Sequence, residues 1–317
     1  MENQWQEDVL GPEYQACEIQ QPDDYEGAVK CVVVRRQAEK LPSEKAVLYV
    51  HGFIDYFFQK ELAEQINSWG LEFYAVDLRK YGRALMPHQK PNYCRSIEEY
   101  FEDIDAALNL MRENGIKSIV LMGHSTGGLT TPLFLNQYKG DDIKALLLNS
   151  PFFDFNVPGP LRMTLPAVMW LGKRFPNMKM DILPQHYPQS LHKDYKGEWD
   201  FDIRWKPIQN FPQYFAWIRA IRLAQVQLQS GLNITQPVLV MHSDKSYKKL
   251  SWSEEVRKSD AVLDVEHIAK YANRLGENVE QLTINDGLHD LVLSRKDVRD
   301  QVYREMENWL NKQGIID

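Results

Sequence analysis

Short apolar runs alternate with segments of helical hydrophobic spacing along most of this 317-residue chain. Runs of about five apolar residues predict buried strands at 46–50, 72–76, 119–122, 143–149, 237–241 and 279–284. Apolar residues at helical spacing predict helices over 57–69, 97–113, 126–138, 263–275 and 298–310. This alternation predicts an α/β fold, a mostly parallel sheet of about eight strands with helices on both faces.

Two regions depart from the alternation. Near the N-terminus, strands at 14–20 and 29–37 flank a polar turn and predict an antiparallel hairpin. Between residues 151 and 235 no strand interrupts the helical pattern, so a mainly helical cap over 151–235 is expected between strands of a core formed by 1–150 and 236–317. In sheets of this kind ligands bind outside the carboxyl ends of the strands, and the cap is expected to cover that edge.

The pattern Gly-x-Ser-x-Gly occupies residues 123–127, between a predicted strand and a predicted helix. A sharp strand-to-helix turn there would expose the Ser125 hydroxyl at its tip. Such a turn requires glycine at positions 123 and 127, because a Cβ at either position would collide with the neighbouring strand and helix. Ser125 is therefore the candidate nucleophile.

A serine hydroxyl needs a base to take its proton, and the base needs an acid to orient it. His289 is the candidate base, because it follows the last predicted strand in a glycine-containing loop at the same sheet edge. Two aspartates fit the acid: Asp244, directly after the strand at 237–241, and Asp260, beyond a charged segment. Asp260 precedes the apolar start of a helix, whereas Asp244 is also suited to a turn.

An oxyanion hole needs two backbone N–H groups that face the developing negative charge. The N–H of Thr126, directly after the serine, is one candidate. The second is the N–H of Phe53, in the loop after the strand at 46–50.

Five further residues are candidates for contacts with substrate. His51 and Gly52 end the first parallel strand, and His124 lies inside the serine turn. Met163 and Trp170 belong to the apolar part of the cap and are candidates for a pocket wall, although packing within the cap would explain them equally well.

Composition narrows the function further. The net charge of −7 and the absence of a Lys/Arg stripe interleaved with aromatic residues argue against a nucleic-acid partner. The N-terminus lacks the features of a signal peptide. The sequence contains no long uncharged apolar stretch, so no membrane anchor is predicted and a cytoplasmic location is expected. Three cysteines without metal-like spacing predict reduced thiols, and neither a metal nor an organic cofactor is indicated. The oligomeric state is left open.

These motifs together resemble the α/β-hydrolase fold. They are Val50 to Phe53, Asp77 to Arg83, Gly123 to Gly128, Ser259 to Val262 and Leu288 to Asp290. Within that fold the chain is similar to the branch that holds monoacylglycerol lipases, lysophospholipases and serine aminopeptidase-type hydrolases. The resemblance spans about residues 29–310, and it implies Asp260 as the acid, because in that branch an apolar helix start follows the acid. The bulky Phe53 and the extra segment 245–259 depart from the branch.

The resulting hypothesis is a serine hydrolase that cleaves a small-molecule carboxylic ester through an acyl-enzyme on Ser125. The apolar cap favours an apolar acyl ester, such as a monoacylglycerol or a lysophospholipid. An aminopeptidase is the first alternative, since Glu198, Asp200 and Asp202 could hold the ammonium group of a peptide. A non-catalytic binding protein on a hydrolase scaffold is the second.

Overall fold

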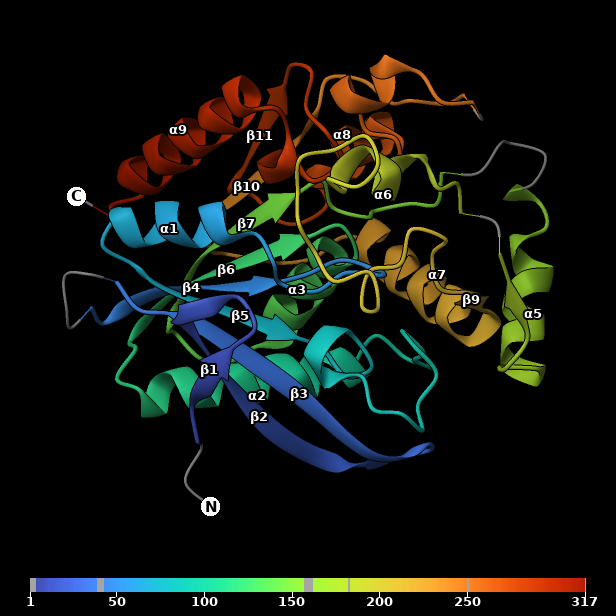
Figure 1. The fold of residues 1–317 in the computed structure, drawn as a ribbon, viewed down its shortest axis with the longest axis horizontal. Coiled ribbons are helices and arrows are strands. Elements are labelled where there is room, and N and C mark those ends of the chain that lie inside the picture. The colour runs from blue at the N-terminus through green and yellow to red at the C-terminus, as the bar shows by residue number, and fades with distance from the viewer. Residues whose placement is uncertain (1–3, 39–42, 157–161, 182, 250, 317) are drawn as a thin grey trace.

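The computed structural model describes residues 4–38, 43–156, 162–181, 183–249 and 251–316. Within these residues one large sheet forms the centre of the molecule, in the order β1-β2-β3-β5-β4-β6-β7-β10-β11 (Figure 1). Its strands are β1 (Gln6–Asp8), β2 (Gly11–Asp24), β3 (Gly27–Arg36), β4 (Lys45–Val50), β5 (Glu72–Asp77), β6 (Ser118–His124), β7 (Ile143–Asn149), β10 (Val238–Ser243) and β11 (Val279–Ile284).

The six strands from β5 to β11 run parallel, and β3, β2 and β1 extend the sheet at the β5 edge, each paired antiparallel to its neighbour. The expected α/β-hydrolase architecture is confirmed, with nine strands in place of about eight. The additional strand, β1, has the sequence Gln-Glu-Asp and carries no apolar signal that would predict it. In the predicted hairpin, Ile19 on β2 pairs with Cys31 on β3.

Helices cover both faces of the sheet. They are α1 (Lys60–Ser68), α2 (Glu99–Glu113), α3 (Thr126–Gln137), α5 (Leu165–Arg174), α6 (His186–Leu191), α7 (Phe215–Gln229), α8 (Val265–Ala272) and α9 (Lys296–Lys312). Along β4, Leu48 and Val50 join the apolar layer that contains α2 and α3, whereas Val47 and Tyr49 join the layer that contains α1 and α9. This strict alternation is what a strand buried on both sides requires.

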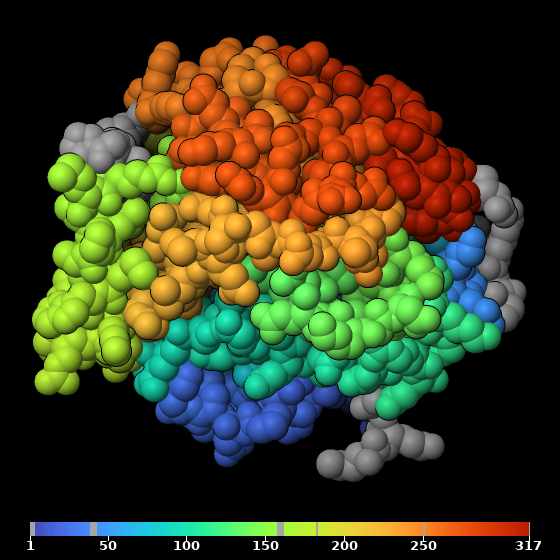
Figure 2. Space-filling model, turned by 180° about the vertical axis from the view of Figure 1, so that it is seen from behind, coloured from blue at the N-terminus to red at the C-terminus, as the bar shows by residue number. Residues whose placement is uncertain are grey.

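The segment 151–235 lies beyond the carboxyl ends of the parallel strands, at the side toward which the arrows point in Figure 1. Seen from behind, α5 projects at one edge of the molecule beside α7 (Figure 2). The expectation that this segment lacks strands is wrong, because β8 (Lys179–Met180) pairs with β9 (Gln213–Tyr214). Helix α7 packs into the same apolar layer as α3, so the division into core and cap stays a prediction.

The motif from Asp77 to Arg83 fixes the loops at the end of β5. The carboxylate of Asp77 accepts hydrogen bonds from the backbone N–H groups of Phe57 and Arg83, at 2.9 and 3.0 Å. Arg79 binds Asp103 on α2 with its guanidinium, at 2.8 Å, and both side chains are buried. The motif is therefore fully engaged in structure, and it anchors α2 and the loop after β4.

Among the described residues, no helix has both the length and the apolar character needed to cross a lipid bilayer.

Replacing Arg79 with Met should lower the free energy of unfolding by about 3–5 kcal/mol, because the Asp103 carboxylate would stay buried without its cation. The matched control is Lys296→Met, which breaks the exposed pair between Lys296 and Asp300 on α9 and should cost about 0.5 kcal/mol or less. Urea unfolding monitored by fluorescence measures both, and equal losses would contradict this account.

Candidate active site

Ser125 occupies a strained turn between β6 and α3. Its backbone has φ 53° and ψ −113°, a left-handed conformation that a residue with a side chain rarely adopts. Three hydrogen bonds hold it there: the Ser125 N–H donates to the Asn149 carbonyl at 3.0 Å, and the Ser125 carbonyl accepts from Leu129 and Phe152 at 3.2 and 2.9 Å. The surroundings thus fix the strained backbone at the one residue predicted to be the nucleophile.

Glycines make this turn sterically possible, as the sequence predicts. A Cβ on Gly127 would collide with the carbonyl oxygen of Val50 at the end of β4, and a Cβ on Gly123 would collide with the Gly127 backbone. A third glycine contributes from the facing loop, because a Cβ on Gly52 would lie 3.0 Å from the Cβ of Ser125. The turn and the loop after β4 are therefore in backbone contact.

The structure brings Asp260 and His289 together. The Asp260 Oδ2 lies 2.9 Å from the His289 Nδ1, and both side chains are buried. The other carboxylate oxygen, Oδ1, accepts the backbone N–H groups of Val262 and Leu263 at 2.8 and 2.7 Å. With both oxygens engaged, the carboxylate has one orientation and can hold the imidazole in one tautomer.

Asp244 does not contact His289. Its carboxylate accepts the N–H of Asp286 at 2.9 Å and so ties the end of β10 to the loop after β11. The two ends of the extra segment 245–259 lie together, since Ser246 and Asp260 form a β-bridge and Asp260 N–H donates to the Lys245 carbonyl at 2.9 Å. The insertion therefore leaves Asp260 at the sheet edge despite its distance along the chain.

Ser125 and His289 approach the same edge of the sheet from β6 and from the loop after β11. The ring of His124, the residue before the serine, lies 5.0 Å from the ring of His289, centroid to centroid. Among the described contacts, no hydrogen bond joins the Ser125 hydroxyl to His289. Such contacts commonly tighten only when substrate binds.

The two candidate oxyanion donors belong to segments that touch: Thr126 follows Ser125, and Phe53 follows Gly52, which lies against Ser125. Neither the N–H of Phe53 nor that of Thr126 has a hydrogen-bond acceptor among the described residues. The ring of Phe53 stacks on Trp217 of α7, with the centroids 3.8 Å apart. Trp217 is a contact that sequence reasoning missed, because helix periodicity alone does not say which buried aromatic residue reaches the loop after β4.

His51 is committed to the backbone. Its Nδ1 donates to the Gly52 carbonyl at 2.8 Å, and its Nε2 accepts the Leu78 N–H at 3.0 Å, so both ring nitrogens are used. This arrangement requires a neutral imidazole with its proton on Nδ1. Burial lowers the pKa of His51 further. The ring supports the loop that carries Phe53 and offers no free polar atom to a ligand.

The other residues predicted to contact substrate fall into two groups. Gly52 and His124 lie against the serine turn, as described above. Met163 and Trp170 do not come together with these residues: their side chains are 83 % and 63 % exposed, on the outer side of the segment 151–235. Helical spacing showed that α5 has an apolar face, but not that part of this face would stay uncovered. A contact of either residue with substrate stays a prediction.

A cluster of buried charges lies behind the candidate triad and was not predicted. Asp55, His124 and Asp290 place one ligand atom each within 4.8 Å of one another, and Lys206 pairs with Asp55 at 2.7 Å. Asp290 directly follows His289 in the sequence, yet its carboxylate lies 4.0 Å from the Nδ1 of His124, whereas the carboxylate that contacts His289 is Asp260.

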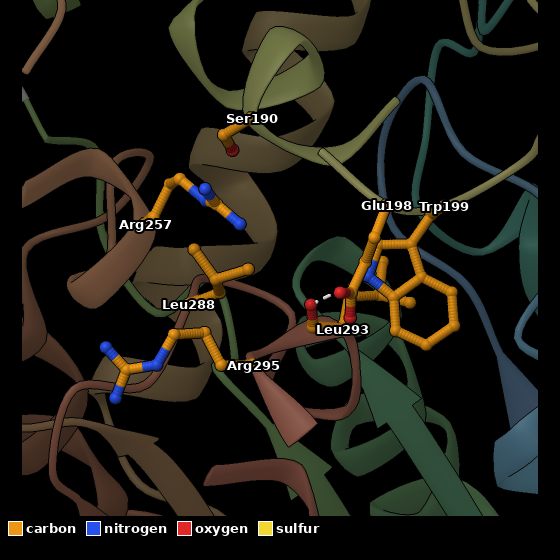
Figure 3. A pocket seen from close by; sticks show the side chains of 7 residues that line it. All are labelled: Ser190, Glu198, Trp199, Arg257, Leu288, Leu293 and Arg295. Carbon is orange, nitrogen blue, oxygen red and sulfur yellow. Dashed lines mark hydrogen bonds between the residues drawn. The ribbon is translucent and has the colours of Figure 1, made fainter. Parts of the chain in front are cut away.

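The carboxylates considered for an ammonium site are already paired. Glu198 binds Arg299 at 2.6 Å, Asp200 binds Lys193 at 2.6 Å, and Asp202 binds Arg204. A small pocket near Glu198 is shown in Figure 3; it is lined by Ser190, Glu198, Trp199, Arg257, Leu288, Leu293 and Arg295. The lining contains two arginines and one carboxylate, a charge pattern opposed to the binding of an ammonium ion.

His51 should become protonated at a lower pH than an ordinary histidine side chain, because burial and its two backbone hydrogen bonds favour the neutral ring. Nitrogen-15 NMR of the histidine-labelled protein measures this. In the unfolded chain His51 has its ordinary pKa of about 6.5, so protons bind the unfolded state preferentially below that pH and stability falls as the protein is acidified. An imidazolium pattern for His51 at neutral pH would contradict the assignment.

The sequence pattern of the family described as "Serine aminopeptidase, S33" matches residues 42–295. Phospholipase YtpA of Bacillus subtilis (strain 168) is 26 % identical over 136 residues, which cover 43 % of this chain and about half, 51 %, of that relative.

Two solved structures share the fold. A soluble variant of the Saccharomyces cerevisiae monoglyceride lipase, in complex with a substrate analog, superposes with a TM-score of 0.70 at 19 % identity, covering 93 % of this chain and 94 % of that chain. The monoacylglycerol lipase of Paleococcus ferrophilus gives a TM-score of 0.66 at 17 % identity, covering 89 % and 98 %.

Proposed function

Because the chain belongs to the serine aminopeptidase S33 family of α/β-hydrolases, we propose that it hydrolyses carboxylic esters through an acyl-enzyme formed on Ser125. The observation that carries the proposal is the 2.9 Å contact between Asp260 and the Nδ1 of His289. That contact leaves Nε2 as the ring nitrogen available to take a proton from the serine.

In the proposed reaction the Ser125 hydroxyl attacks the acyl carbonyl while His289 accepts its proton. The negative charge that develops on the carbonyl oxygen is stabilised by the N–H groups of Phe53 and Thr126. His289 then returns the proton to the leaving alcohol, and the acyl group stays on Ser125. A water molecule, deprotonated by His289, attacks the acyl-enzyme and releases the carboxylic acid.

The substrate is proposed to be an apolar acyl ester, such as a monoacylglycerol or a lysophospholipid. Aromatic side chains support this choice. Phe53 of the loop after β4 stacks on Trp217, and Phe152, whose N–H binds the Ser125 carbonyl, packs against Phe155 with the ring centroids 5.2 Å apart. The relatives described above include a monoglyceride lipase, a monoacylglycerol lipase and a phospholipase, which is in line with an acyl ester.

The cytoplasmic location stays a prediction. Cys17, Cys31 and Cys94 are buried free thiols, in keeping with a reducing compartment. Burial raises the pKa of Cys31 and of Cys94, which keeps these two thiols protonated and unreactive.

Nitrophenyl esters of increasing acyl length test the proposal. Turnover should rise with acyl length, and Ser125→Ala should lower kcat by a factor of about 10⁶. Asp260→Asn should lower kcat by about 10⁴, because the amide favours the wrong tautomer of His289. Asp244→Asn is the matched control and should stay within about a factor of two of the wild type. No turnover at any chain length, or unchanged turnover by Ser125→Ala, would dismiss the proposal.

Aminopeptidase activity is tested with amino-acid naphthylamides. We expect no release, because the three carboxylates near α6 are already neutralised by Arg299, Lys193 and Arg204. A variant with Glu198→Gln, Asp200→Asn and Asp202→Asn together should keep its ester turnover. Naphthylamide release that disappears in this variant would instead establish the peptidase alternative.

A further inference from the structure

Four buried ionisable side chains meet directly behind the serine turn. Asp55, His124, Asp290 and Lys206 are each at most 5 % exposed. They come from four different parts of the chain: the loop after β4, the end of β6, the loop after β11 and the segment 151–235. Burying this many ionisable groups is costly unless their charges are balanced and held in place.

Distances show how the four groups pair. The Lys206 ammonium donates to Asp55 Oδ1 at 2.7 Å. The Nδ1 of His124 lies 3.5 Å from Asp55 Oδ2 and 4.0 Å from Asp290 Oδ2, between the two carboxylates. Neither ring nitrogen of His124 has a conventional hydrogen-bond partner within the described part of the chain. His124 therefore lies where two buried carboxylates focus negative potential.

A charge count points to the state of His124. With a neutral imidazole, two carboxylates face one ammonium group and the buried cluster carries a net charge of −1. With an imidazolium, two negative charges face two positive charges and the cluster is neutral. Since an uncompensated charge in a dry interior costs several kcal/mol, the protonated ring is the favoured state.

A bound metal ion fits the cluster less well than a proton does. Asp55, His124 and Asp290 form the one group among the described residues with ligand atoms spaced for a cation. However, Lys206 already occupies one oxygen of Asp55, and both oxygens of Asp290 accept amide N–H groups, from Asn149 at 2.7 Å and from Gln59 at 3.1 Å. A divalent ion would also lie beside the ammonium group and leave the cluster positively charged.

Three members of the cluster lie within two residues of a candidate catalytic group. His124 directly precedes Ser125, and Asp290 directly follows His289. Asp55 lies two residues after Phe53, in the loop whose N–H is a proposed oxyanion donor. Lys206 belongs to the segment over the strand ends. The cluster thus joins the four pieces of chain whose mutual placement defines the site.

Asn149 reinforces the same connection. Its carbonyl accepts the Ser125 N–H at 3.0 Å, its side-chain amide donates to Asp290, and its side-chain oxygen accepts the Leu291 N–H at 3.2 Å. One residue at the end of β7 therefore holds the serine turn and the His289 loop together, and it fixes the carboxylate that faces His124.

We propose that His124 is a positioning residue that works as a buried imidazolium. Together with Lys206 it neutralises Asp55 and Asp290, and the electrically balanced cluster holds Phe53, Ser125 and His289 in fixed relative positions. The catalytic consequence rests on the proposed ester hydrolysis, whereas the protonation state of His124 does not.

Titratable groups from every neighbouring element face the cluster. They are Asp55 and His51 from the loop after β4, Tyr49 from β4, Asp290 and His289 from the loop after β11, and Lys206 and Tyr187 from the segment 151–235. Burial by itself lowers the pKa of His124, but Asp290 and Asp55 outweigh burial and raise it above the ordinary value. The pKa of Asp55 is held well below its usual range, because Lys206 and His124 outweigh burial there.

Nitrogen-15 NMR of the histidine-labelled full-length chain tests the charge state directly. The His124 signal is identified by its loss in His124→Gln, and an unstructured histidine peptide added to the sample is the reference. We expect His124 to stay an imidazolium at pH values where the peptide imidazole is neutral. In Asp55→Asn the cluster is balanced with a neutral ring, so His124 should titrate at a lower pH than in the wild type. A His124 ring that is neutral wherever the peptide imidazole is neutral would overturn the proposal.

Ester turnover tests the positioning role by charge rescue. His124→Gln leaves one unbalanced buried charge and should lower kcat on the order of ten- to a hundredfold, with KM changed by about threefold or less. Adding Asp55→Asn removes the excess charge and should recover most of the lost kcat. His88→Gln should match the wild type. If the loss of kcat in the double variant equals or exceeds the combined losses of the two single variants, His124 acts only through packing.

Two measurements keep these outcomes distinct. If His124→Gln does not fold, as judged by circular dichroism, the comparison of the wild type with Asp55→Asn by NMR still decides the charge state. Elemental analysis of the purified protein decides between a proton and a metal: a stoichiometric metal ion, removed by EDTA together with a change in the His124 signal, would refute the imidazolium. An inactive wild type with an imidazolium at His124 would refute the proposed hydrolysis alone.

Discussion

Backbone crowding between the ends of β4 and β6 is the constraint on which the site depends. Gly127 lies so close to the Val50 carbonyl that a side chain has no room there, and a Cβ on Gly52 would lie 3.0 Å from the Cβ of Ser125. The proposed oxyanion donors, the N–H groups of Phe53 and Thr126, belong to the residues that follow Gly52 and Ser125 in these two touching segments. The strained backbone of Ser125 persists because these surroundings leave it no alternative.

Hydrogen-bonded polar groups extend this constraint into the interior. Asp77, His51 and Asn149 use their side chains to bind backbone groups of neighbouring loops, and Arg79 binds Asp103 and Glu102 on α2, so all four hold loops and helices in place. Burying charged groups costs free energy. In this chain the buried charges lie where three loops and the segment 151–235 must keep one arrangement. These four side chains are of the same chemical types as catalytic ones. They differ because their polar atoms are already hydrogen-bonded within the protein.

The alternation of apolar strands and helices was sufficient to predict the α/β fold, the parallel sheet and the placement of Ser125 on a sharp turn. It missed β1, because three polar residues carry no hydrophobic signal, and the two-residue strands β8 and β9, because they are shorter than any periodicity. The pairing of Asp260 with His289 was favoured by the resemblance rather than by spacing. Lys206 and Asp55 could not have been paired in advance, since 151 positions separate them along the chain and neither belongs to a motif.

The most direct test of the account is a crystal structure of the protein after reaction with an alkyl fluorophosphonate, which mimics the tetrahedral intermediate of ester hydrolysis. The account predicts phosphorus bonded to the Ser125 Oγ, the phosphoryl oxygen within hydrogen-bonding distance of the Phe53 and Thr126 N–H groups, and the Nε2 of His289 facing the serine oxygen. An unmodified Ser125, or a phosphoryl oxygen that faces away from both N–H groups, would contradict it.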